Sequence, residues 1–263
     1  MLLFGFLFLG MIAGLLAGLL GIGGGIIIIP GLIYLFKSTS LVVEQELMHI
    51  VLGSSLASIV LTSAIAIAVH ARANLIRWDI ARKLIPGLIV GAMIGPYVAS
   101  QLNTQVLLLL FSGFLMLLAL RFIFNWHSEV ILPVPATPIM YGIGVVIGAI
   151  TSMLGLGGGL LLIPFLSYLP LSIREISALS LVCIFPVALL ATLGYIIFGW
   201  NASDLPRMST GYVYWPAVLP LMLASGIFTP LGIAWSKRVS TEGLKKIFGY
   251  VVLGLSLYLI LFG

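Results

Sequence analysis

Two glycine-rich strings with the same pattern most constrain what this chain can fold into. GIGGGIIIIP occupies residues 21–30 and GLGGGLLLIP occupies residues 155–164, with all four glycines and the proline in register. Each glycine inside a helix costs about 1 kcal/mol relative to alanine, so each string should interrupt an apolar helix. The alternative is that these glycines only let helices pack closely. Consecutive glycines point to all sides of a helix, however, which favours a functional break.

Small residues at four-residue spacing precede each string and fit the packing alternative better. They are Gly10, Gly14 and Gly18 in the first half, and Gly144, Gly148 and Ser152 in the second. Such stripes let membrane helices approach one another closely. We therefore predict helix packing on the stripes and a broken or re-entrant helix at Gly21–Gly25 and at Gly155–Gly159.

The composition is that of a multi-pass integral membrane protein. Hydrophobic residues make up 62% of the 263 residues and charged residues only 7%, whereas an average soluble domain has roughly 25% charged residues. The mean hydropathy is +1.28. Apolar runs long enough to cross a bilayer occupy residues 47–70, 80–101, 105–125, 174–199, 213–236 and 243–262, and residues 2–36 and 138–169 hold the strings. We expect an all-α protein with roughly 8 to 10 membrane segments. Residues 2–36 lack a cationic n-region, so we expect a retained segment rather than a signal peptide.

Loop charges predict two repeats of inverted topology. In the first pair of equivalent loops, the loop at 70–83 is basic, while the loop at 200–212 carries one acid and one base. In the next pair the basic loop is in the second half: the loop at 101–104 is uncharged and the loop at 237–246 is basic. Basic loops favour the cytoplasmic side, so equivalent loops lie on opposite sides of the membrane. That arrangement requires an odd number of crossings in each repeat. A helix, a glycine break and a returning half-helix satisfy the count and place both termini outside.

Further pairs extend the repeat over nearly the whole chain. In the Ser-containing segments that follow the two strings, Ser55 pairs with Ser180 and Leu179 stands where the first half has Ser54. We expect a single membrane domain with a first repeat at 1–126, a Pro-containing linker at 127–137 and a second repeat at 138–263.

The twin GxGGG…P strings, the Ser-containing segment after each, and GAMIGPYVA at 91–99 resemble the TauE/SafE family of sulfite exporters, also called the TSUP family of anion transporters. The resemblance implies a secondary transporter in the inner (cytoplasmic) membrane that moves small sulfur-containing anions, such as sulfite or sulfoacetate, by alternating access. Another small anion or sulfur metabolite is the alternative cargo. The chain departs from the family pattern at Leu179 and at Asn74, where the family often has glycine.

Backbone chemistry at the strings also favours an anion. Gly23, Gly24 and Gly25, and likewise Gly157, Gly158 and Gly159, should expose N–H groups beside the positive end of a half-helix, which attracts negative charge. The hydroxyls of Ser54, Ser55 and Ser180 could donate to the same ligand. The alternative is that these hydroxyls bond to the carbonyl one turn back, as is common in membrane helices.

Candidate groups for coupling transport to H⁺ or Na⁺ are few. The predicted spans contain almost no acids away from their ends, which disfavours a cation cargo. Glu44, Glu46 and Glu175 stand at helix entrances, where solvated interfacial charge is the ordinary role. His49 and His70 stand near span ends, where packing is the ordinary role, but imidazole is also a common proton carrier.

The other function classes find little support in the sequence. There is no HExxH motif and His49 is poorly placed to activate Ser55, so we expect no enzyme, cofactor or metal. The lone Cys183 excludes an intrachain disulfide. The net charge of +5 comes from short loops between spans, which indicates topology and contact with anionic lipid rather than a nucleic-acid partner. A non-transporting membrane scaffold stays open, and the sequence carries no signal for an oligomeric state.

Overall fold

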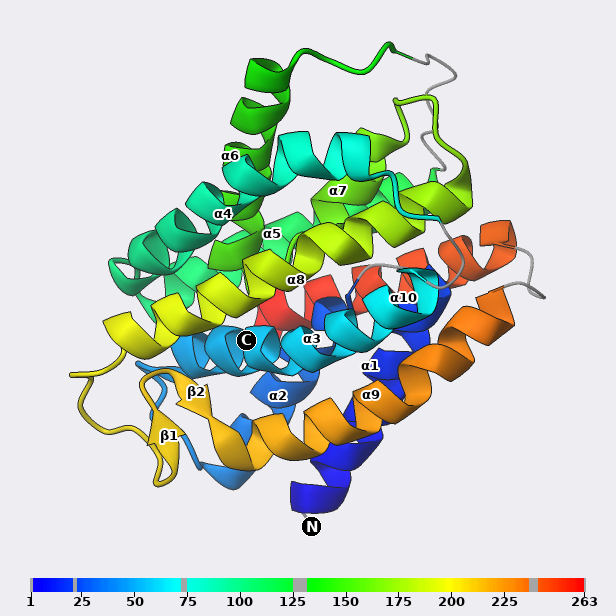
Figure 1. Ribbon diagram of the computed structural model, residues 1–263. Coiled ribbons are helices and arrows are strands. Elements are labelled where there is room, and N and C mark those ends of the chain that lie inside the picture. The colour runs from blue at the N-terminus through cyan, green and yellow to red at the C-terminus, as the bar shows by residue number, and fades with distance from the viewer. Residues whose placement is uncertain (1, 21–22, 72–74, 125–131, 237–240, 263) are drawn as a thin grey trace.

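The computed structural model describes residues 2–20, 23–71, 75–124, 132–236 and 241–262. Within these residues the chain forms ten helices and one short hairpin (Figure 1). The elements are α1 (Leu2–Leu20), α2 (Gly25–Thr39), α3 (Leu47–Ala71), α4 (Trp78–Ser100), α5 (Thr104–Ile123), α6 (Thr137–Met153), α7 (Gly159–Leu166), α8 (Ile173–Phe198), β1 (Ser209–Thr210), β2 (Val213–Tyr214), α9 (Trp215–Ser236) and α10 (Thr241–Phe262).

Six of the described helices are long and apolar enough to cross a membrane, namely α1, α3, α4, α5, α8 and α9. The helices α2 and α6 and the stretch Phe248–Leu261 of α10 are apolar but shorter. The all-α class is therefore confirmed, and so are five of the six predicted spanning runs; of the sixth, at 243–262, only the shorter apolar stretch Phe248–Leu261 is found. Of the predicted linker at 127–137, residues 127–131 lie outside the described residues.

Small residues decide which helices touch. A Cβ atom added at Gly14 of α1 would lie 2.5 Å from the carbonyl oxygen of Ser225 in α9, and one added at Gly148 of α6 would lie 2.5 Å from that of Leu88 in α4. Both distances are far below van der Waals contact, so only glycine allows these pairs to approach so closely. The predicted stripes are thus packing faces, and they join α1 to α9 and α6 to α4.

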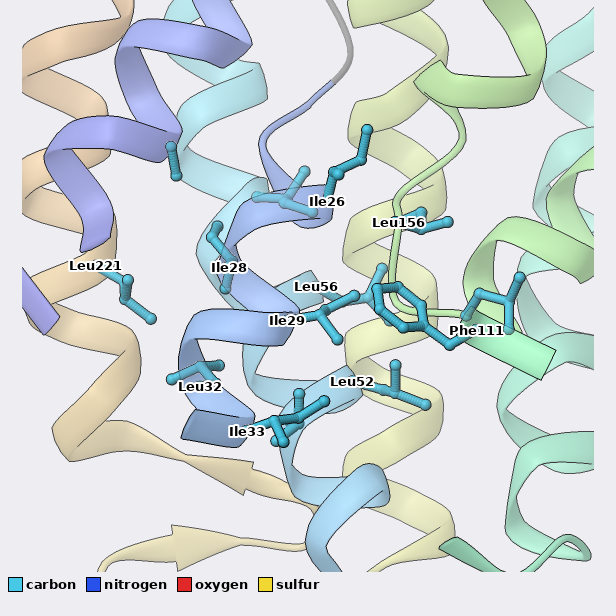
Figure 2. Packing of buried hydrophobic residues seen from close by; sticks show 14 of the residues in the cluster. Ile26, Ile28, Ile29, Leu32, Ile33, Leu52, Leu56, Phe111, Leu156 and Leu221 are labelled. Atoms are coloured by element: carbon cyan, nitrogen blue, oxygen red, sulfur yellow. The ribbon is translucent and has the colours of Figure 1, made fainter. Parts of the chain in front are cut away.

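The long helices α3 and α8 pack against each other in the middle of the molecule (Figure 1). Gly53 near the start of α3 lies against Tyr195 near the end of α8, and Ile59 and Ile184 further along both border Gly157, so the two helices are antiparallel. Figure 2 shows the isoleucines of α2 between Leu221 of α9 on one side and Leu52 and Leu56 of α3 on the other. This apolar core surrounds the first glycine string.

A two-residue hairpin lies between α8 and α9. β1 and β2 pair antiparallel, and Gly211 at the turn has φ +53°, a conformation that glycine favours. The side chains of Tyr212, Val213 and Tyr214 are buried, with exposed fractions of 7%, 0% and 8%. We call residues 212–214 the hairpin plug. The first two residues of the apolar run predicted at 213–236 form β2 rather than helix, because they pair with β1.

Candidate anion site at the two helix breaks

The first break separates α1 from α2. α1 ends at Leu20 and α2 begins at Gly25, and between them Gly23 and Gly24 have φ values of 85° and 78°. Side chains rarely tolerate such angles, so the backbone requires glycine at both positions. The carbonyl of Gly24 accepts from the N–H groups of Ile27 and Ile28, which starts the new helix. Gly21 lies outside the described residues.

The second break has the same construction. α6 ends at Met153 and α7 begins at Gly159, while Gly155, Gly157 and Gly158 have φ values of 71°, 72° and 109°. The carbonyl of Gly158 accepts from the N–H of Leu162. Helices thus end at both predicted strings, and the cause is the same left-handed glycine backbone.

The two breaks touch each other. A Cβ atom added at Gly25 would lie 3.1 Å from the carbonyl oxygen of Gly155 and 3.2 Å from the Cα of Leu156. A Cβ atom added at Gly157 would lie 3.3 Å from side-chain carbons of both Ile59 and Ile184. Ile59 and Ile184 lie near the midpoints of α3 and α8, so the breaks meet at half the height of the two central helices.

Backbone donors collect where the breaks meet. Within the described part of the chain, the N–H groups of Gly23–Gly25 and of Gly157–Gly159 donate no hydrogen bond. α2 leads toward the start of α3 and α7 toward the start of α8, so the two short helices run in opposite directions and direct their positive ends to the centre. Unpaired N–H groups at two positive helix ends favour a bound anion.

The three candidate serines are all fully buried, but they lie in different surroundings. Ser55 donates a 3.0 Å hydrogen bond to the carbonyl of Gly155 and therefore lies at the breaks. Ser54 accepts a 3.0 Å hydrogen bond from the N–H of Tyr214 and so faces the hairpin plug. Ser180 donates a 3.0 Å hydrogen bond to the carbonyl of Ser177 in its own helix, which fits the alternative of bonding to the preceding turn.

The candidate proton carriers lie at the ends of the central helices, away from the breaks. His49 is near the start of α3, where its Nε2 lies 3.1 Å from the carbonyl oxygen of Ala99. Glu175, in the first turn of α8, accepts from the N–H and the hydroxyl of Ser172 in a capping box, and it lies 3.6 Å from Arg77. The side chain of His70 lies outside the described residues.

Two contacts at the breaks were not anticipated from the sequence. Ile59 and Ile184 line both strings, and they stand four residues after Ser55 and Ser180, so the internal alignment contained the signal. Tyr195 donates a 2.8 Å hydrogen bond to the carbonyl of Met153 and so fixes the end of α6. Among the described residues, no three His, Cys, Asp or Glu side chains gather where they could hold a metal ion.

Ten apolar helices, two of them started by buried glycine breaks, define a multi-pass α-helical membrane protein with broken helices. Residues 6–259 match the family described as "Sulfite exporter TauE/SafE", and the chain therefore belongs to this family of transmembrane transporters.

Similar proteins cover nearly the whole chain. A "Probable membrane transporter protein" of Haemophilus influenzae is 30% identical over 96% of this chain and 97% of its own length. The "Probable membrane transporter protein YunE" of Bacillus subtilis is 26% identical over 93% of this chain and 92% of its own. A further "Probable membrane transporter protein", from Xylella fastidiosa, is 27% identical over 95% of this chain. No solved structure matches the chain significantly.

Proposed function

We propose that this protein is a secondary transporter that carries small sulfur-containing anions, sulfite or an organosulfonate such as sulfoacetate, across the cytoplasmic membrane by alternating access. The observation that carries the proposal is the contact between the two breaks, with Gly25 against Gly155 and Leu156 in the middle of the protein. The family description, which names sulfite, supports the class of cargo.

The site would bind an oxyanion chiefly through backbone N–H groups. Without a Cβ, the glycines of both strings let oxygen atoms approach the main chain closely. Hydrogen bonds to a charged group are worth about 1.5–3 kcal/mol each, so a few such donors suffice without arginine. Ser55 would join them by turning its hydroxyl from the Gly155 carbonyl to the ligand, and Ser180 would act from α8.

Packing partners support two inverted repeats at 1–126 and 138–263. In two such repeats, α1 to α5 correspond in order to α6 to α10. The contact of α1 with α9 then corresponds to the contact of α6 with α4. In the same way, the contact of α3 with α9 corresponds to the contact of α8 with α4. The pairs α3–α8 and α5–α10 then correspond to themselves. Antiparallel α3 and α8 agree with inverted rather than parallel repeats.

Charge supports the orientation in the membrane. The ion pair between Arg77 and Glu175 places the starts of α4 and α8 at one end of the molecule, where Arg82, Lys83 and Arg174 also lie. This basic end would face the cytoplasm. The opposite end holds the hairpin plug and the turn with Glu44 and Glu46.

A pocket lies between the long helices on the side of the basic end. It has a volume of about 450 Å³ and lies between α3, α4 and α8, lined by Ala64, Ile67, Trp78, Ile85, Val182, Phe185 and Pro186. Trp78 follows Arg77 at the basic end, and Pro186 stands two residues from Ile184 at the breaks. The lining is formed by apolar side chains, so the pocket itself offers an anion no charged group.

Flux into proteoliposomes tests the proposal. The panel is sulfite, sulfoacetate, thiosulfate, sulfate and acetate, each with an imposed pH or Na⁺ gradient, and the recovered cargo is identified chemically. Transport of a sulfur anion, recovered intact, is expected. Preferential transport of acetate would replace the proposed cargo with another small anion. Chemically altered cargo would indicate an enzyme, and no transport of any anion by folded protein would refute the carrier.

A further inference from the structure

The hairpin plug lies at the end of the molecule opposite the basic one. The N–H of Tyr212 donates to the carbonyl of Tyr195 in α8 at 3.2 Å, and the N–H of Tyr214 donates to Ser54 in α3 at 3.0 Å. The ring of Tyr214 meets Phe36 of α2 edge to face at 5.8 Å. The plug therefore contacts α2, α3 and α8. Of these helices, α3 carries Ser55 and α8 carries Ile184, and both residues lie beside the breaks.

The imidazole ring of His49 stacks on the ring of Tyr212 in the plug. Its ring lies 4.8 Å from the ring of Tyr212 at an angle of 26°, and the side chain is only 5% exposed. Since a carbonyl only accepts, the contact between Nε2 and the Ala99 oxygen requires the proton on Nε2. In the neutral ring the other nitrogen, Nδ1, then has no hydrogen.

That bare nitrogen faces a carboxylate. Nδ1 lies 3.5 Å from Oε2 of Glu46, and neither atom has a hydrogen-bond partner among the described residues. Two buried acceptors that face each other without a hydrogen are unfavourable, and one added proton satisfies both. An Nδ1–H⁺···⁻O bond would be charge-assisted, and the imidazolium would lie over the face of Tyr212.

We propose that Glu46 and His49 form a proton-binding site that locks the hairpin plug when it is occupied. The role of this site in transport rests on the proposed function. In that role, the site makes H⁺ rather than Na⁺ the coupling ion. Proton binding seats the plug and closes the non-cytoplasmic end. Proton release leaves Nδ1 and Oε2 unpaired and loosens the plug, which opens a path toward the breaks.

The other groups around the pair leave the proton on it. From the plug, Tyr212 faces Glu46, and burial and then the charge and hydrogen bond of Glu46 raise the pKa of its hydroxyl to about 12, so it stays neutral. From α8, the Tyr195 hydroxyl is bonded to the Met153 carbonyl. From α4, the Ala99 carbonyl lies 3.1 Å from Nε2. From α2, Lys37 lies 3.9 Å from Glu44, two residues before Glu46, so its charge is directed to that carboxylate.

The closing experiment needs no substrate. ¹⁵N-histidine spectra of the His70→Gln/His127→Gln double variant in detergent report His49 alone, and hydrogen exchange reports the amides of Tyr212 and Tyr214. Both are recorded from pH 8.5 to pH 4.5, and the proposal predicts that a proton on Nδ1 of His49 and protection of the plug amides appear together. The protection factors of both amides should rise about tenfold over the same pH range.

Two variants and a control make the result decisive. Glu46→Gln and His49→Gln should lose the pH dependence of protection, while Glu44→Gln, at a carboxylate that is 82% exposed, should keep it. A His49 ring that does not titrate, or a titration that leaves plug protection unchanged in the wild type, overturns the proposal. Failure of the flux panel with an intact titration would instead refute the proposed function and leave the proton site standing.

Discussion

Replacing Gly25 with alanine should weaken transport far more than its size suggests. The added Cβ would lie 3.1 Å from the Gly155 oxygen, 3.2 Å from the Leu156 Cα and 3.3 Å from the Ile59 Cδ1. Each contact is shorter than an ordinary van der Waals contact, and two of them are with backbone, so the breaks must separate by a few tenths of an ångström. Overpacking of this kind costs about 1–3 kcal/mol.

If the proposed site is correct, the separation would also displace the backbone N–H groups that are proposed to bind the anion. Loss of one or two backbone hydrogen bonds to a charged ligand, at about 1.5–3 kcal/mol each, corresponds to an affinity loss of about tenfold or more. We expect the half-saturating anion concentration for flux into proteoliposomes to rise by that factor. Thermal unfolding of the same preparation separates the binding effect from the loss of stability.

The matched control is Gly142→Ala in α6, where the added Cβ has no neighbour within 4 Å. It should transport as the wild type does. If Gly25→Ala also kept wild-type half-saturation and rate, the anion could not lie against Gly25, and the reasoning from the touching breaks would be refuted.

Two further variants test the packing around the site. Ser55→Ala removes the hydrogen bond between the Ser55 hydroxyl and the buried Gly155 carbonyl, so it should cost about 1–3 kcal/mol of unfolding free energy, measured in detergent. An unchanged stability would contradict this bond. Gly14→Leu forces a side chain against the backbone of Ser225 and should prevent α1 from packing on α9. The control is Gly254→Leu, because a Cβ added at Gly254 has no neighbour within 4 Å. The yield of monodisperse protein in size-exclusion chromatography should fall for Gly14→Leu alone, and equal yields would contradict the close approach of α1 and α9.

Local features of the fold were predictable because their causes are local. Positive φ angles need glycine whatever surrounds them, so the strings revealed both breaks. Hydropathy revealed the spans, because lipid demands apolar side chains over a fixed length. The stripe of Gly10, Gly14 and Gly18 revealed a packing face as well. It did not reveal that the partner is α9, because a small residue allows close approach without selecting the neighbour.

Contacts between distant residues account for what the sequence did not predict. The bond from Tyr214 to Ser54 spans 160 residues and takes Ser54 out of the set that faces the breaks. The stacking of His49 on Tyr212 likewise depends on how the α8–α9 connection folds over α3. Neither pattern has a spacing or motif that sequence inspection can detect. The unequal pair Ser54 and Leu179 did signal asymmetry, and its structural counterpart is the plug contact.

The most direct test of the central claim is whether one anion contacts both breaks. In ¹⁵N-glycine-labelled protein, the amide signals of Gly23–Gly25 and of Gly157–Gly159 are followed while the transported anion is added. The account predicts that both groups shift together with a single saturation concentration, while Gly113 and Gly142 stay unchanged. A shift confined to one string, or to neither, would contradict a shared backbone site.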